Sequence, residues 1–158
     1  MTQSLSGEQV ANRVREVLPN AVVKADGIDL YLRSEAMLDV CRFLKEAPDM
    51  EMDYLTSITG VDYMDYLEVV YHLTSIARNH SVVVKTKLYD RAAPELPSVI
   101  SLWQGAEFQE REVYDFFGII FTGHPDLRRI LMWDGYANFP LRKDYLGLNY
   151  GQRPALVE

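Results

Sequence analysis

Residues 66–89 read YLEVVYHLTSIARNHSVVVKTKLY and contain two of the strands that decide the fold. Large apolar side chains dominate every second position over 67–73 and again over 82–88, the period expected when successive side chains point to opposite faces of a sheet. We expect strands over 66–77 and 80–89. Only Arg78 and Asn79 separate them, and so short a connection joins neighbouring antiparallel strands.

The same kind of pattern extends toward the N-terminus. Strand-like runs at 54–61, 28–32 and 21–24 are rich in residues that favour sheets, and Asp26-Gly27 fits a hairpin turn. A helix over 7–18 follows a capping box formed by Ser6 and Gln9.

Two further helices complete the pattern. We expect Ser34 to cap one of them, and the composition of 96–117 predicts another that ends at Gly118. The order αββαβββα predicts an α+β fold: a mostly antiparallel five-stranded sheet with helices packed on it, followed by an irregular C-terminal tail. We assign residues 1–120 to the α+β domain and 121–158 to an extended tail that binds a partner.

Composition excludes several classes of protein. The chain has 158 residues, about one domain, and a net charge of −7 from 16 basic and 23 acidic side chains, which argues against nucleic acid as a partner and disfavours binding to anionic lipid. Cys41 is the single cysteine, and its place on the apolar stripe of the second helix predicts a buried, inert thiol. The N-terminal residues have neither the basic nor the apolar part of a signal peptide, and no apolar run approaches the ~20 residues of a membrane span.

Motifs that carry chemistry are not found in the sequence. There is no glycine-rich phosphate loop, nucleophile elbow or His-Glu-x-x-His pattern. The three histidines His72, His80 and His124 are scattered. We therefore expect no cofactor or metal in this chain.

The acidic residues near position 110 allow two interpretations. On a helical projection Glu110 lies on the apolar side, whereas Glu112 and Asp115 lie on a side that we expect to be solvated. A buried carboxylate needs a partner or must become neutral. Glu110 is then either a structural ion-pair partner, with Arg128 or Arg129 nearest in sequence, or a general acid or base. We favour the structural interpretation.

The last forty residues lack a clean period but keep Ile130, Leu131, Met132, Trp133 and Phe139. Such side chains must pack on this domain or on a partner. Pro140 biases the preceding residue toward an extended conformation, so we expect Leu141 and Lys143 to face one way and Arg142 and Asp144 the other. We expect Arg142 to grip a carboxylate of the partner or of this domain, and Lys143 to act as a point charge at the rim.

Two blocks carry a resemblance to a known family: EREVYDFFGIIFTGHPDLRRILM at 110–132 and PLRKDY at 140–145. They are similar to the signature of the C subunit of respiratory complex I (NADH–quinone oxidoreductase), whose counterpart in cyanobacteria and chloroplasts is the J subunit of NADH dehydrogenase. The upstream order of elements agrees with that family. Leu146 stands where the family usually has proline, and residues 133–138 replace a more usual acidic-Trp-x-Gly run.

The resemblance implies a hydrophilic scaffold protein of the peripheral arm, on the cytoplasmic side of an inner or thylakoid membrane. It implies packing against the D subunit at the quinone site and near iron–sulfur subunits, with flavin and clusters held by partners and contact with the membrane only through the complex. The expected structural and interface residues are Glu110, Arg111, Glu112, Asp115, His124, Asp126, Arg128, Arg129, Arg142, Lys143 and Asp144.

Two alternatives remain. Related complexes that oxidise ferredoxin or coenzyme F420H2, or that act as hydrogenases, use similar subunits. A free-standing small enzyme with Glu110, His124 or Asp126 as acid–base groups is the other hypothesis, and the lack of a nucleophile–base–orienter set counts against it.

Overall fold

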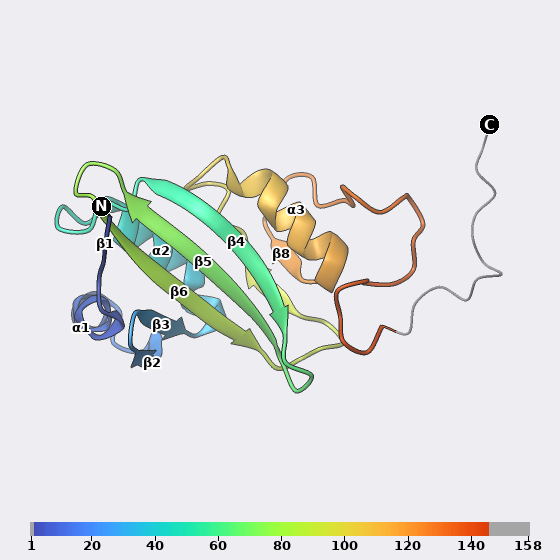
Figure 1. The fold of residues 1–158 in the computed structure, drawn as a ribbon, viewed down its shortest axis with the longest axis horizontal. Helices are drawn as coiled ribbons and strands as arrows, with labels where there is room; N and C mark the ends of the chain where they lie inside the picture. The colour runs from blue at the N-terminus through green and yellow to red at the C-terminus, as the bar shows by residue number, and fades with distance from the viewer. Residues whose placement is uncertain (1, 146–158) are drawn as a thin grey trace.

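The computed structural model describes residues 2–145. It confirms the α+β class, and its main sheet has six strands (Figure 1). Five of them lie in the order β2 (Val22–Asp26), β3 (Asp29–Leu32), β6 (His80–Leu88), β5 (Leu67–Ser75) and β4 (Tyr54–Asp62), and the sixth, β1 (Gln3–Ser4), pairs with the start of β6. The antiparallel pairs β4–β5 and β5–β6 confirm the hairpins predicted from the alternating pattern.

The N-terminal half follows the sequence closely. Helix α1 (Gly7–Val17) begins at the predicted capping box, with Ser6 and Gln9 bonded to each other's backbone N–H. The hairpin of β2 and β3 turns at Gly27, which has a left-handed φ of +58°. The predicted cap at Ser34 is wrong: Ser34 begins a 3-10 turn, η1 (Ser34–Ala36), and α2 (Met37–Glu46) starts after it without a side-chain cap.

Two features of the sheet differ from the expected five-stranded arrangement. Strand β3 is parallel to β6, and so is the additional strand β1. Alternating apolar residues define a strand but not the direction of its neighbour. Here α2 and two further strands separate β3 from β6 in the chain, so the pairing is set by tertiary packing.

Helix α3 (Ala106–Phe117) is shorter than predicted. Residues 95–97 instead form β7 (Glu95–Pro97), which pairs in parallel with β8 (Ile120–Thr122) in a separate two-stranded sheet. The two prolines Pro94 and Pro97 lack the backbone N–H that a helix interior needs. The helix ends at Gly118 as predicted, in a left-handed conformation with φ +71°.

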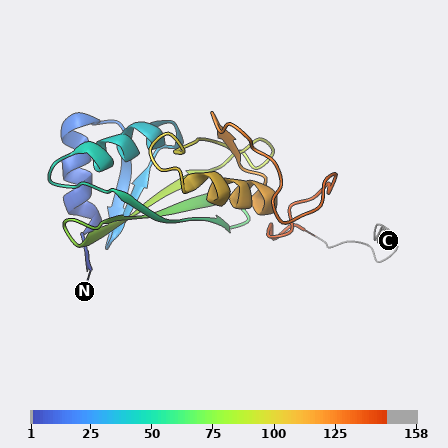
Figure 2. The same ribbon diagram turned by 90° about the horizontal axis from the view of Figure 1, so that it is seen from above.

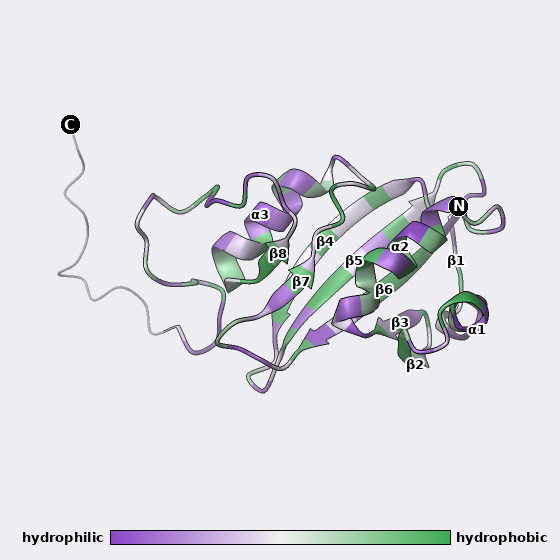
Figure 3. Ribbon diagram, turned by 180° about the vertical axis from the view of Figure 1, so that it is seen from behind, coloured by the Kyte–Doolittle hydropathy of each residue, from purple (hydrophilic) through white to green (hydrophobic). Residues whose placement is uncertain are grey.

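Helix α2, α3 and the small sheet lie on one face of the main sheet, as Figures 2 and 3 show, and the opposite face is turned toward the viewer in Figure 1. The hydrophobic core fills the space between the layers and includes Tyr71, Met37, Leu44 and Trp103. Cys41 is buried there, as predicted, and burial raises the pKa of its thiol to about 12.

Residues 123–145, which we call the C-terminal segment, continue from β8 without strand or helix (Figure 1). The segment folds back past the end of α3, so that Phe139 meets Gly118. Residues 146–158 of the predicted tail lie outside the described residues.

Candidate functional site

Asp115 on α3 organises the C-terminal segment. Its side chain is fully buried, and one carboxylate oxygen accepts a hydrogen bond of 2.7 Å from Arg129 Nη1. The other oxygen accepts backbone N–H bonds from residues 130, 131 and 132, at 3.1, 2.7 and 2.8 Å. Burial alone would raise the pKa of Asp115, but these bonds outweigh it and hold the pKa below its ordinary value.

Arg129 continues the same network toward the end of the chain. Its guanidinium donates to the backbone carbonyls of Tyr136 at 2.5 Å and Asn138 at 3.0 Å. It also lies 5.2 Å from the ring centroid of Phe139, a cation–π distance. Arg129 therefore links α3, through Asp115, to the later residues 136–139 of the segment.

Two other residues of the 110–132 block fasten the start of the segment. Arg111 donates to the carbonyls of Arg128 and Arg129, both at 3.2 Å. His124 contacts the carbonyl of Glu107 through Nε2 at 3.1 Å and accepts the N–H of Asp126 at Nδ1. Because Nδ1 accepts this bond, Nε2 is the nitrogen that can donate to the Glu107 carbonyl.

The far end of the segment is held by a second buried carboxylate. Asp62, at the end of β4, forms a bidentate pair with Arg91 at 2.6 and 3.0 Å and accepts the backbone N–H of Lys143 at 2.8 Å. The Arg91 hydrogen bonds hold the pKa of Asp62 well below its usual range, although burial opposes them. Arg91 also pairs with Asp144 at 3.2 Å.

Arg142 was expected to grip a carboxylate of this domain or of a partner, and the structure contradicts the first of these while the second stays a prediction. Arg142 does not bind a carboxylate within residues 2–145; it donates to the carbonyls of Phe117 at 2.6 Å and Arg91 at 3.0 Å. Residues 139–145 also form successive turns, with Arg142 N–H bonded to the Phe139 carbonyl and Tyr145 N–H to that of Arg142, so the expected extended backbone is wrong. The reason is Pro140, whose fixed φ suits the second position of a turn.

Glu110 is buried as predicted, but its predicted pairing with Arg128 or Arg129 is wrong. Its carboxylate accepts from Ser98 Oγ at 2.6 Å and Val99 N–H at 2.7 Å, on the domain side of α3. Burial raises its pKa, and these hydrogen bonds only partly oppose that effect. Enclosed in this way, the carboxyl group has no access to a substrate, which counts against the acid–base hypothesis.

Asp115, and not Glu110, is the carboxylate that pairs with Arg129. The expectation that Asp115 is solvated is wrong, because the C-terminal segment covers that side of α3. Glu112 is exposed as expected. Arg128 and Asp126 form an exposed pair of their own at 2.8 Å.

Sequence reasoning missed Asp62, Arg91 and Ser98. Asp62 directly follows the strand predicted at 54–61 and Arg91 follows the strand predicted at 80–89, so neither position has a local pattern that marks it. Their roles come from contacts between residues far apart in the chain, such as Asp62 with Lys143.

Three large apolar side chains of the C-terminal segment remain exposed. Leu131 is 60% exposed, Leu141 53% and Trp133 44%. The backbone that carries them is fixed by Asp115, Arg129 and Arg142. Exposed apolar groups on a held backbone are typical of a protein interface.

Within residues 2–145 no cluster of three or more histidine, cysteine, aspartate or glutamate side chains has the arrangement of a metal site. No helix in the same range is long and apolar enough to cross a membrane.

Comparison with known proteins points to one family. The family described as "Respiratory-chain NADH dehydrogenase, 30 Kd subunit" matches residues 30–150. The C subunit of NADH-quinone oxidoreductase from Roseiflexus sp. (strain RS-1) is 40% identical over 148 residues, which cover 89% of this chain and 84% of that protein. The C 2 subunit of the same enzyme from Rhizobium etli (strain CIAT 652) is 46% identical over 125 residues, 77% of this chain and 66% of that protein.

Two further similarities extend the comparison. The C/D subunit of NADH-quinone oxidoreductase from Phocaeicola vulgatus is 50% identical over 103 residues, which make up 65% of this chain but 20% of that protein. A chain in the structure of the membrane-bound sulfane sulfur reductase, an archaeal respiratory membrane complex, superposes with a TM-score of 0.70 at 29% identity, covering 92% of this chain and 88% of that one. Since the family match spans more than half of the sequence and includes both the buried carboxylates of α3 and the C-terminal segment, this chain belongs to the 30 kDa subunit family of respiratory-chain NADH dehydrogenase.

Proposed function

We propose that this protein is a scaffold component in the peripheral arm of a proton-pumping NADH–quinone oxidoreductase, where it holds the D-type subunit at the quinone site. The observation that carries the proposal is the network of Asp115. Four N–H donors converge on its carboxylate and fix a segment that has no helix or strand of its own. That segment presents Leu131, Trp133 and Leu141 to the outside.

The relatives support the choice of partner. In Phocaeicola vulgatus the matching sequence is part of a protein whose name joins the C and D subunits, which suits two components that stay together. A subunit that always stays beside its partner can be fused to that partner in one chain, and the interface between them does not have to change. Flavin and iron–sulfur clusters are then held by partner subunits, and the complex places this chain on the cytoplasmic side of its membrane.

A second assignment has its own support. The similar chain in the sulfane sulfur reductase belongs to a respiratory membrane complex with another name and another reaction. The same scaffold role in a complex with a different electron donor would use the same surface, because the Asp115 network is formed entirely by residues of this chain.

The test is co-purification of the D-type subunit from the native membrane with the tagged full-length chain. Replacement of Leu131 and Trp133 by serine should reduce the recovered D-type subunit about tenfold or more, since truncation of two buried interface side chains costs more than 1.4 kcal/mol. The melting temperature should stay within a few degrees. A matched control replaces Ile76, which is also exposed but lies at the β5–β6 connection, by serine.

The control should assemble normally. Full recovery of the D-type subunit with the Leu131 and Trp133 variant would show that the C-terminal segment is not part of the interface. Recovery of the native chain only as a free monomer would overturn the scaffold function itself.

A further inference from the structure

Basic and aromatic side chains on β3 and β6 alternate with buried core residues, and so they lie on the face of the main sheet opposite the core. Tyr31 on β3 is paired in register with Lys24 on β2 and with Lys85 on β6. The ammonium groups of Lys24, Lys85 and Lys87 lie 4.4, 5.7 and 5.6 Å from the centroid of the Tyr31 ring. Lys87 lies closer still to the ring of Tyr66, at 4.2 Å, so the three cations are distributed over two aromatic rings.

Two carboxylates lie next to these lysines, one beside Lys85 and one opposite Lys87. Asp29 pairs with Lys85 at 2.6 Å. Glu68 on β5 stands opposite Lys87 in register but is buried, and burial raises its pKa. Within residues 2–145, neither Lys24 nor Lys87 has a carboxylate within the 4.0 Å of an ion pair.

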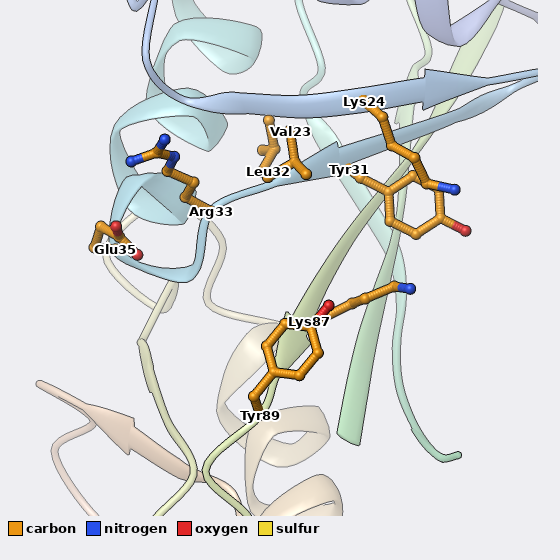
Figure 4. Close-up of a pocket in the computed structure, with 8 residues that line it drawn as sticks. All are labelled: Val23, Lys24, Tyr31, Leu32, Arg33, Glu35, Lys87 and Tyr89. Atoms are coloured by element: carbon orange, nitrogen blue, oxygen red, sulfur yellow. The ribbon is translucent and has the colours of Figure 1, made fainter. Parts of the chain in front are cut away.

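The part of this face around Lys24 and Lys87 is therefore positive in a chain whose net charge is −7. Lys24 is exposed and Lys87 partly exposed, and the two lysines flank the opening shown in Figure 4. An anion that enters the opening is attracted to both ammonium groups.

A groove opens beside these lysines where β3 leaves the sheet. The pairing of β3 with β6 ends at Leu32 and Thr86, whereas β6 continues beside β5 to Leu88. The resulting cavity has a volume of about 400 Å³ and is lined by Val23, Lys24, Tyr31, Leu32, Arg33, Glu35, Lys87 and Tyr89. Figure 4 shows Lys24 and Tyr31 on one side of the opening and Lys87 and Tyr89 on the other.

The walls of the groove are apolar as well as basic, and Glu35 is the one acidic side chain among the described residues that line it. Val23 is 61% exposed and Tyr89 70% exposed, and both line the opening. A simple inorganic anion would use only the ammonium groups and leave these surfaces in water. A peptide segment that carries both carboxylates and an apolar side chain matches the whole lining.

We propose that this groove docks an acidic segment of a partner protein, whose carboxylates pair with Lys24 and Lys87 while an apolar or aromatic side chain packs on Val23, Tyr31 and Tyr89. The groove reaches from the hairpin of β2 and β3 to Tyr89, two residues before Arg91, which the C-terminal segment contacts. Its lining residues differ from Leu131, Trp133 and Leu141, the exposed residues of the surface assigned to the D-type subunit, so it is a second candidate interface.

The test measures binding of a fluorescent synthetic peptide of alternating glutamate and tyrosine to the full-length chain. The double variant Lys24→Gln with Lys87→Gln should bind about tenfold more weakly at low salt, since each exposed ion pair contributes up to a factor of about five. The matched control is Arg15→Gln with Arg42→Gln, which makes the same change of charge on α1 and α2. It should bind like the unchanged chain.

Tyr89→Ser tests the apolar part of the groove and should weaken binding even at high salt, where ion pairs are screened. An equal loss in both double variants would overturn the proposal, because the peptide would then sense only net charge. Competition by inorganic phosphate as effective as by peptide would also overturn it in favour of a small-anion site. Lysine-dependent binding to vesicles of anionic phospholipid, with no binding of the peptide, would assign the groove to a membrane instead.

Discussion

The ring of Phe139 lies directly against Gly118, so that a Cβ atom added to this glycine would stand 2.5 Å from the ring. Gly118 ends α3 in a left-handed conformation, and Phe139 belongs to the segment that folds back over it. The end of the helix and the position of the C-terminal segment therefore both depend on residue 118 being a glycine.

We expect Gly118→Ala to destabilise the fold by about 2 kcal/mol or more, because it adds a steric clash to the left-handed backbone strain. Gly27→Ala is the matched control, since Gly27 has a similar φ of +58° but open space around it. Only the backbone strain, about 1 kcal/mol, should appear there. Urea unfolding of both variants measures the difference, and equal losses would show that Phe139 moves away without cost.

Replacement of Asp115 by asparagine should lower the free energy of unfolding by about 3–5 kcal/mol, because it leaves the largely buried Arg129 without its counter-charge. Glu112→Gln, on the exposed side of the same helix, should change it by less than about 0.5 kcal/mol. Unfolding in urea at neutral pH provides the measurement. A small effect of Asp115→Asn would mean that the three backbone N–H bonds alone hold the segment.

The two buried carboxylates of α3 should respond to pH in opposite directions. The folded-state pKa of Asp115 is lowered, so its contribution is present above the unfolded value of about 3.9 and is lost as the pH falls through the folded pKa. The folded-state pKa of Glu110 is raised, so its contribution is present below about 4.3 and is lost as the pH rises through the folded pKa.

Glu110→Gln should therefore be neutral or stabilising at pH 7, because the amide can accept from Val99 without a buried charge. The stability of this variant should also fall less than that of the unchanged chain as the pH rises above about 4.3. Unfolding curves collected across the weakly acidic to neutral range test this. A large loss of stability at neutral pH would mean that the ionised carboxylate has a partner of its own.

Arg142→Ala should loosen the end of the C-terminal segment more than Lys143→Ala does. Arg142 donates through its side chain to two carbonyls, whereas Lys143 contacts Asp62 through its backbone N–H, which alanine keeps. Arg142→Lys should restore part of the protection, since an ammonium group can reach one carbonyl but cannot reproduce the planar fork. Hydrogen exchange over residues 139–145 measures the effect, and equal exchange in the two alanine variants would contradict it.

Strands and helices with a local period were predictable to within about two residues. The strands predicted at 54–61 and 80–89 are found at 54–62 and 80–88, and the helix predicted at 7–18 is found at 7–17. The partners of α3 were not predictable in the same way. A helical projection assumes one buried face, and Asp115 lies about 140° around the helix from Glu110. It is buried because a second layer, the C-terminal segment, covers that side.

The block at 110–132 was nevertheless recognisable as the part of the chain that carries the family resemblance. Arg111, Asp115, His124 and Arg129 all take part in holding the segment. Their pairing could not be read from spacing, since each bond joins residues 14 to 18 positions apart across a stretch without a regular period. The resemblance to a family indicated which residues to examine. Which of them bond to one another became clear only from the contacts in the structure.

Fastening the C-terminal segment at Asp115 near one end and at Asp62 near the other has a thermodynamic consequence for assembly. A loop closed at both ends has already lost most of its conformational entropy when the domain folds. A partner that meets Leu131 and Trp133 on this loop binds a preorganised surface, and little ordering remains to oppose association. Variants that release either anchor should therefore slow or weaken assembly even where every contacting side chain is unchanged.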